Sequence, residues 1–314
     1  MPGRLAPISE DPIRSIALVR AAVEARAGPD DPLEERVAYV EREIRSGRFR
    51  GGLWIRDGRA VGLAWWDPPG VRGTHLRLVY LEPDVVSPAS YHEFLDSVER
   101  SAGPLVTAPP LAGLSGEEET EVLGGLGFAP FARFEMRLPS GMPSPDRQAP
   151  PGFVLRPLRP EDQGAVARVH AAAFRDRFDR YLFLEDPDPE RDAEKVVASL
   201  LHGQWGEYLP WASFAAETAG NVIGVTIVLR APGRALIADV SVDPAHQGHG
   251  IGRALVCACV NELRDRGEPT IALVVTEGNR RAIHLYESLG FVRAFAPDRR
   301  WYRTRLIPVS PDAG

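Results

Sequence analysis

The hydrophobic pattern divides the chain into two stretches, each of which alternates strand-like and helix-like segments. In the first stretch, two apolar runs flank Asp57-Gly58, a pair that readily takes the positive φ angles of a hairpin turn. Segments with apolar residues at every third or fourth position, the spacing of an amphipathic helix, surround this hairpin. The pattern predicts helices over 13–27, 34–46, 91–100 and 117–125, and strands over 52–55, 60–66, 76–81, 105–107 and 134–138.

The second stretch repeats this order of elements. Its first predicted helix opens at Pro160 with acidic residues in the first turn, where they suit the positive end of the helix dipole. An acidic, aromatic loop is expected over 175–191. The pattern predicts helices over 160–174, 189–201, 250–267 and 280–288, and strands over 153–156, 213–217, 222–229, 237–242, 269–276 and 301–307.

A proline-rich segment separates the two stretches. Residues 139–151 contain five prolines among polar residues and glycine, a composition that does not form regular structure. A length of 314 residues also fits two domains of ordinary size better than one. We therefore expect a first domain over 1–138, a linker over 139–151 and a second domain over 152–314.

Three short motifs recur in both stretches at a nearly constant separation of about 160 residues. The pairs are Val61-Gly62-Leu63 with Ile223-Gly224-Val225, Leu81-Glu82-Pro83 with Val242-Asp243-Pro244, and Leu126-Gly127-Phe128 with Leu289-Gly290-Phe291. Such a fixed offset indicates that the two domains are copies of one fold.

The clearest chemical signal is the glycine-rich turn between the strand at 237–242 and the helix that follows. Gly248, Gly250 and Gly252 let backbone N–H groups converge on phosphate oxygens, and the helix N-terminus adds its dipole. A dinucleotide fingerprint would need glycine in place of Arg253. A Walker loop would need a lysine after the last glycine, and the only lysine is Lys195. The remaining interpretations are an anion cradle of another kind and a plain tight turn.

The strand, the Val-Asp-Pro motif and Gln-Gly-His-Gly-Ile-Gly-Arg over 247–253 resemble the coenzyme A loop of the GCN5-related N-acetyltransferase (GNAT) superfamily. Residues 279–291 resemble the family's second signature, an N-x-x-A-x-x-x-Y helix that ends in Leu-Gly-Phe. The resemblance implies an α/β (α+β) fold with two GNAT-like domains, each a mixed, mostly antiparallel twisted sheet flanked by helices. It also implies an N-acetyltransferase that passes an acetyl group from acetyl-CoA, in a ternary complex, to a primary amine of a small molecule or peptide.

The resemblance assigns site residues in the second domain. The residues expected to bind acetyl-CoA are Val240, Ser241, Val242, Gln247, Gly248, His249, Gly250, Ile251, Gly252, Arg253, Asn279, Ala282 and Tyr286. Tyr286 is also the expected general acid, because a thiolate whose thiol has a pKa of about 8.5 leaves more readily when it receives a proton. Many relatives place the general base where this chain has Leu236. Asp239 is the candidate base here, with Glu277, a water chain or a desolvated amine as alternatives.

Composition narrows the function classes further. The formal net charge of −6 gives no overall basic face for nucleic acid or for an acidic membrane. The two cysteines, Cys257 and Cys259, are two residues apart on a predicted helix and so point to different faces. His246 and His249 have the spacing of metal ligands, but the sequence supplies no further ligands near them. No metal site is therefore expected. No signal peptide and no membrane-spanning apolar run are recognisable, which favours a cytoplasmic enzyme. Nothing in the sequence indicates the oligomeric state.

The first copy lacks the chemical features of the second. Where the second copy has its glycine turn, the first has residues 86–91, without glycine and with Pro88, which has no N–H. Leu123 stands in the place of Tyr286. We therefore expect a non-catalytic first domain that covers one side of the acceptor cleft. The acidic, aromatic segment 175–191 is expected to contribute to the same cleft and to favour a cationic or amphipathic amine as the acceptor. The alternative is a non-catalytic acyl-CoA sensor or partner-binding protein, in which Tyr286 is merely packed.

Overall fold

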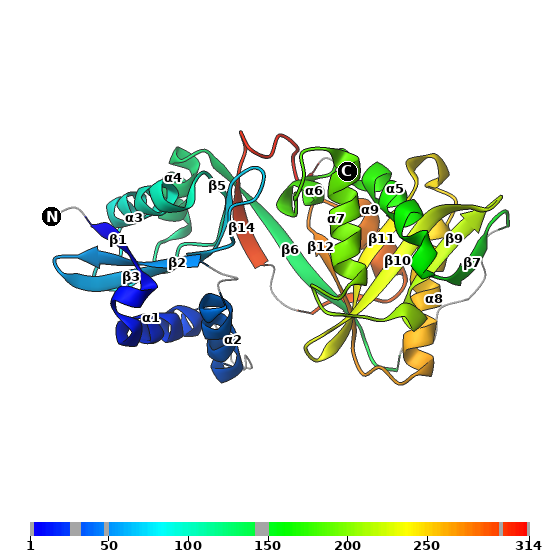
Figure 1. Cartoon of the computed structure of the whole chain (residues 1–314), viewed down its shortest axis with the longest axis horizontal. Helices are drawn as coiled ribbons and strands as arrows, with labels where there is room; N and C mark the ends of the chain where they lie inside the picture. The colour runs from blue at the N-terminus through cyan, green and yellow to red at the C-terminus, as the bar shows by residue number, and fades with distance from the viewer. Residues whose placement is uncertain (1–2, 26–32, 47–49, 142–150, 295–297, 313–314) are drawn as a thin grey trace. The chain divides into compact units, whose positions relative to one another are not determined.

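The computed structural model describes residues 3–25, 33–46, 50–141, 151–294 and 298–312, and the chain divides into two compact units (Figure 1). Unit 1 contains Met1–Phe131 and Arg299–Pro308, and unit 2 contains Ala132–Asp298 and Val309–Gly314. The boundary between the units thus falls before residue 138, inside a strand. The expected linker lies mostly outside the described residues.

Unit 1 is a mixed sheet with helices on both faces. Its strands, in spatial order, are β1 (Arg4–Pro7), β2 (Arg50–Arg56), β3 (Arg59–Trp66), β4 (Thr74–Leu81), β5 (Leu105–Ala108) and β14 (Asp298–Arg303). Only β4 and β5 pair in parallel. Helices α1 (Pro12–Glu24) and α2 (Leu33–Arg45) share one core with the sheet, and α3 (Pro88–Ala102) and α4 (Gly116–Gly125) share the other.

Unit 2 repeats this architecture. Its strands, in spatial order, are β7 (Val154–Pro157), β9 (Phe214–Thr218), β10 (Asn221–Ala231), β11 (Arg234–Val242), β12 (Ile271–Thr276) and β6 (Phe128–Leu138), with the short β8 (Glu207–Tyr208) and β13 (Val292–Arg293) pairing to β10 and β6. One face carries α5 (Gln163–Phe174), α6 (Phe178–Leu182) and α7 (Pro189–Leu201), and the other carries α8 (Ile251–Asp265) and α9 (Arg280–Ser288) (Figure 1). Again, the central pair β11 and β12 is parallel.

The outer strand beside β5 and β12 comes, in each unit, from the other half of the sequence. In unit 2, β6 pairs antiparallel with β12 from Arg133 opposite Thr276 to Leu138 opposite Ile271. In unit 1, β14 pairs antiparallel with β5, with Trp301 opposite Ala108. The sequence pattern predicts both strands as elements. Their pairing was not predicted, because hydrophobic periodicity identifies a strand and not its neighbour.

The repeated glycines of the sequence motifs serve the same close packing in both units. A Cβ atom on Gly224 of β10 would lie 3.0 Å from Ile251 and 3.1 Å from Leu255 of α8. On Gly62 of β3 it would lie 2.6 Å from Leu81 and 2.9 Å from the Tyr80 carbonyl oxygen of β4, and 3.3 Å from Phe94 of α3. A glycine at this point therefore leaves room for the helix after the central strand in both units and, in unit 1, also for the neighbouring strand.

The helices of the described residues are short or carry charged side chains. Among these residues, no helix is both long enough and apolar enough to cross a bilayer.

Candidate active site

The central strands of unit 2 separate and leave an opening at the middle of the sheet. β11 and β12 pair only where Ala235–Ile237 lie beside Ile271–Leu273, although both strands continue beyond that point. Two cavities, of about 270 and 320 Å³, adjoin this opening. The two share a wall formed by Phe174, Asp179, Val240, Asn279, Ala282 and Tyr286.

The first cavity lies at the glycine-rich turn before α8. Gly248 and Gly250 have φ angles of 85° and 79°, in the left-handed region that glycine adopts at little cost. Gly250 is the N-cap of α8 and supplies no side-chain cap, so the first-turn N–H groups of the helix are left for a ligand. Gly252 has no positive φ, and a Cβ there would make ordinary 3.7 Å contacts. Eleven of the thirteen residues predicted to bind acetyl-CoA line this cavity together, namely Val240, Val242, Gln247, Gly248, Gly250, Ile251, Gly252, Arg253, Asn279, Ala282 and Tyr286.

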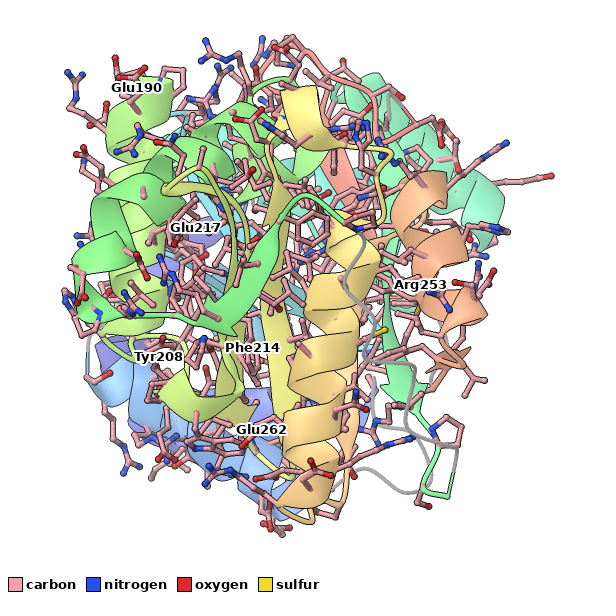
Figure 2. The ribbon with its side chains drawn as sticks, turned by 90° about the vertical axis from the view of Figure 1, so that its right-hand side faces the viewer. Glu190, Tyr208, Phe214, Glu217, Arg253 and Glu262 are labelled. Carbon is pink, nitrogen blue, oxygen red and sulfur yellow. The ribbon has the colours of Figure 1, made fainter. Side chains whose placement is uncertain are left out.

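Side chains around this turn hold it in place. Gln247 donates from Nε2 to the Val242 carbonyl oxygen at 2.9 Å and accepts at Oε1 from Arg281 Nη1 at 2.7 Å. Arg253 reaches from α8 toward α9 and donates to Ser288 Oγ at 2.8 Å (Figure 2). Two guanidinium groups therefore stand beside free helix amides, an arrangement that suits a phosphate-bearing ligand such as the pyrophosphate of coenzyme A.

A bulge in β11 decides where Asp239 lies. In the register with β10, Ile227 is opposite Asp239 and Val228 is opposite Ile237, so Ala238 is an extra residue. Ile227 belongs to the core under α5 and α7, whereas Val228 belongs to the core under α8. Asp239 therefore projects to the side of α5.

Asp239 is buried and holds two hydrogen bonds. Ser241 Oγ donates to Asp239 Oδ1 at 2.7 Å, and His170 Nδ1 of α5 lies 3.0 Å from Asp239 Oδ2. The His170 ring also stacks on Phe174, one turn further along α5, with ring centroids 4.5 Å apart. Sequence reasoning missed His170, because a lone histidine on an apolar helix, 69 residues from its partner, gives no motif.

Tyr286 of α9, whose side chain carries a hydroxyl group, lines both cavities. Burial, with a smaller contribution from the charge of Asp239, raises the pKa of the Tyr286 phenol above its ordinary value of 10.0. The phenol is therefore protonated at neutral pH. Among the described residues its hydroxyl has no hydrogen-bond partner. Asn279 caps α9, with its Oδ1 accepting from the Ala282 amide at 3.2 Å, and lines both cavities.

Some of the residues predicted for the active site lie outside both cavities. Neither Ser241 nor His249 lines a cavity, and His249 is exposed. The alternative base Glu277 also lies outside both cavities, 3.6 Å from Arg293 in an exposed ion pair. Burial raises the pKa of the Cys259 thiol to about 12, which leaves it unreactive. Within the described ranges, no three His, Cys, Asp or Glu side chains are grouped for a metal ion.

The second cavity combines paired charges with an apolar rim. Asp179 Oδ1 lies 3.7 Å from Arg133 Nε and accepts a hydrogen bond from Thr276 Oγ1 at 2.5 Å. Arg180 Nε donates a hydrogen bond to Asp192 Oδ2 at 3.2 Å. At the rim, Phe183 and Trp205 are each 40% exposed, with ring centroids 5.9 Å apart, and Val274 is 38% exposed. This cavity can therefore receive a ligand with an apolar body.

Comparisons of the sequence point to acetyl transfer. The model of the acetyltransferase (GNAT) family matches residues 171–291. A mycothiol acetyltransferase from Thermomonospora curvata is 33% identical over 298 residues, which cover 90% of this chain and 91% of that protein. A mycothiol acetyltransferase from Nocardiopsis dassonvillei is 29% identical over 313 residues, which cover 90% of this chain and 92% of that protein.

Solved structures agree on the fold. A GCN5-related N-acetyltransferase from Sphaerobacter thermophilus superposes with a TM-score of 0.65 at 19% identity, with 98% of this chain and 96% of that chain covered. A tandem GNAT protein from the clavulanic acid biosynthesis pathway gives a TM-score of 0.55 at 17% identity, with 95% and 97% covered. The tandem arrangement inferred from the sequence repeat is confirmed by these neighbours.

Proposed function

This chain belongs to the GNAT family of acetyltransferases, which use acetyl-CoA as the acetyl donor, and we propose that unit 2 carries the active site and transfers the acetyl group directly to a primary amine. The observation that carries the proposal is the opening between β11 and β12, where the uncapped N-terminus of α8 and the Tyr286 phenol lie on one connected wall. The first feature suits a pyrophosphate, and the second suits a leaving thiolate.

The first cavity is the proposed donor site. The turn at 247–253 offers backbone N–H groups and two nearby arginines to the phosphates of the donor. Beyond Ile237, the β11 edge toward β12 has no strand partner among the described residues, so Val240 and Val242 have backbone available to an extended ligand arm. Acetyl-CoA supplies the reactive thioester when bound.

Tyr286 is the proposed proton donor. Its raised pKa keeps the phenol protonated at neutral pH, and its hydroxyl is available to a ligand. A thiolate near the hydroxyl would accept that proton as it departs, which favours breakdown toward product. Among the carboxylates, the charge of Asp239 contributes more to the raised pKa of Tyr286 than that of Asp179.

The second cavity is the proposed acceptor site. The carboxylates of Asp179 and Asp192 are paired with arginines, so their charges are largely compensated. The rim of Phe183, Trp205 and Val274 offers apolar surface. We therefore expect a small primary amine on an apolar or aromatic body, of the amphipathic kind. The names of the curated relatives favour a mycothiol-class acceptor as the second candidate.

Unit 1 is proposed to be catalytically silent. Its counterpart of α8, helix α3, is capped by Ser87, whose side chain accepts from the Ser90 amide, and Pro88 occupies the first turn. Leu123, which stands in the place of Tyr286, is fully buried in the core. Unit 1 therefore offers neither the free amides nor the phenol of unit 2.

Thiol release from acetyl-CoA tests this function. The full-length protein is supplied with aromatic amines, aliphatic amines and a mycothiol-class amine, and the acetylated products are identified by mass spectrometry. We expect amine-dependent release with the highest kcat/KM for an apolar amine. Binding of acetyl-CoA without release for any amine would instead support a non-catalytic acyl-CoA sensor.

A further inference from the structure

We propose that His170 is the general base of unit 2 and that Asp239 is its positioning residue; this inference rests on the proposed function and extends it. Asp239 itself is poorly placed to take a proton directly from an acceptor. One of its oxygens accepts from Ser241 at 2.7 Å, and the other faces His170 Nδ1 at 3.0 Å. With 2% of its side-chain surface exposed, the carboxylate has little room for a third partner.

The hydrogen bonds of Asp239 fix the tautomer of His170. An ionised carboxylate only accepts hydrogen bonds, so the imidazole nitrogen that faces it must carry the proton. In the neutral ring of His170, Nδ1 is therefore the N–H and Nε2 holds the free lone pair. Across the described part of the chain, Nε2 has no hydrogen-bond partner. It is the atom that remains free to accept a proton from a ligand.

The position of His170 separates it from the proposed acid. His170 lines the second cavity and not the first, whereas Tyr286 lines both. A base on the acceptor side and an acid shared with the donor side are the arrangement that transfer between two bound substrates requires. The stacking of Phe174 on the imidazole and the hydrogen bond with Asp239 hold the ring in one orientation.

The charges around His170 leave Asp239 as its dominant electrostatic partner. The charged side chains that line the same cavity as His170 are Arg133 of β6, Asp179 and Arg180 of α6, Asp192 of α7 and Asp239 of β11. The Tyr286 phenol of α9 also lines this cavity. Arg133 lies 3.7 Å from Asp179, and Arg180 pairs with Asp192 at 3.2 Å. Because these four charges largely cancel in pairs, the imidazolium formed by proton transfer would be stabilised mainly by Asp239.

The proton and bond changes balance without any further reagent. The neutral amine attacks the acetyl carbonyl carbon, a nitrogen–carbon bond forms and the carbon–sulfur bond breaks. The proton lost by nitrogen goes to His170 Nε2, and the proton gained by sulfur comes from the Tyr286 hydroxyl. The products are an N-acetyl amine and the free thiol of coenzyme A. Proton exchange with water then returns both side chains to their starting states.

The test measures kcat/KM against pH for the full-length wild type and for His170→Gln, Asp239→Asn and His202→Gln. His202 is an exposed histidine outside both cavities and serves as the matched control. We expect His170→Gln to lower kcat/KM by about 10²- to 10³-fold and to abolish the inflection on the acidic limb. Asp239→Asn should lower it by about 10²-fold, because an amide N–H facing Nδ1 favours the opposite tautomer. Acetyl-CoA affinity should stay within about twofold in all variants, and His202→Gln should match wild type.

A second variant, His170→Ala, distinguishes a general base from a residue with a structural role. Imidazole added to His170→Ala should restore part of the lost turnover, with a dependence on the concentration of free imidazole base, which a structural role would not produce. An active wild type whose pH profile is unchanged in His170→Gln, or a His170→Ala protein that folds and binds acetyl-CoA but shows no rescue, overturns the base assignment alone. A wild type inactive with every amine overturns the proposed function, and the base assignment with it.

Discussion

Ile237 and Asp239 are separated by a single residue on β11, yet they project from opposite faces of the sheet because Ala238 is bulged. In a regular strand both would point the same way, and the carboxylate would enter the core under α8. The bulge instead brings Asp239 to His170 of α5, and leaves Ile237 packed among apolar residues. One extra residue in a strand thus brings Asp239 and His170 together in the second cavity.

Replacing Tyr286 with phenylalanine should reduce turnover and leave donor binding intact. The ring packs near Phe291, with centroids 6.0 Å apart, and that contact survives in the variant. Loss of the proton donor should lower kcat by about 10²- to 10³-fold. Calorimetry with acetyl-CoA and the thiol-release assay measure the two effects separately. Tyr208→Phe, which removes a hydroxyl outside both cavities, is the control, and equal activity in the two variants would remove Tyr286 from the mechanism.

Placing an acidic side chain in the glycine turn should abolish donor binding. In Gly250→Asp, a carboxylate stands at the start of α8, where it repels a pyrophosphate and its Cβ obstructs backbone approach. We expect at least a 100-fold loss of acetyl-CoA affinity by calorimetry. Gly233→Asp is the control, since Gly233 also has a positive φ, of 70°, but lies in the turn between β10 and β11. If Gly250→Asp folds and binds acetyl-CoA normally, the donor site lies elsewhere.

Removing the aromatic rim should weaken the acceptor and not the donor. Trp205→Ala deletes a ring that is 40% exposed and contacts Phe183 at the mouth of the second cavity. Loss of partial burial against an apolar amine is worth about 1.4 kcal/mol, which corresponds to about a tenfold higher KM. Initial rates at saturating acetyl-CoA measure the change. Val154→Ala, at a residue that is 66% exposed outside both cavities, should have no effect, and an equal KM in the two variants would place the acceptor elsewhere.

His75 in unit 1 should make the protein less stable in acid. Burial, assisted by the positive charge of Arg77, lowers the pKa of His75 from 6.5 to about 4. The unfolded chain therefore binds a proton between pH 6.5 and 4 that the folded chain does not, and stability falls as the pH drops through this window. The loss is about 3 kcal/mol when complete. Chemical denaturation at several pH values should show a smaller acid loss for His75→Gln than for wild type, and identical profiles would contradict the assignment.

Cutting the chain at the expected linker should prevent unit 2 from folding. A fragment of residues 152–314 lacks β6, and with it the buried side chains of Phe134, Met136 and Leu138. Three such side chains are worth about 5–8 kcal/mol, comparable to the stability of a whole domain. A fragment of residues 132–314 keeps the strand and should retain acetyl-CoA binding. Solubility and calorimetry compare the two, and equal behaviour would show that β6 is dispensable.

The sequence predicted the elements and the position of the glycine-rich turn well, because both depend on local patterns. Helical spacing located α5, α7, α8 and α9, and the glycine turn was found at the start of α8 as expected. The five-residue α6 was expected as loop, since one helical turn among acidic residues is too short to show periodicity. The four-residue β1, which ends at Pro7, was missed for the same reason.

The second cavity could not be predicted in the same way. Arg133, His170 and Asp239 meet there from β6, α5 and β11, and no spacing along the chain relates them. The bulge at Ala238 cannot be read from alternation, because Ile237 and Asp239 look like residues of one face. The sequence therefore offered Asp239 as the candidate base, with Glu277, a water chain or a desolvated amine as alternatives, and His170 beside Asp239 emerged only from the fold.

The exchange of β6 and β14 also constrains how this protein can evolve. After a tandem duplication, a copy that has lost its chemistry is ordinarily free to be deleted. Here, a deletion of the first half would strip β12 of its neighbouring strand, and a deletion of the second half would do the same to β5. If the first half is silent, as proposed, selection for the second half is therefore enough to preserve the reading frame of the first, whose sequence can drift only as far as its strands still pair.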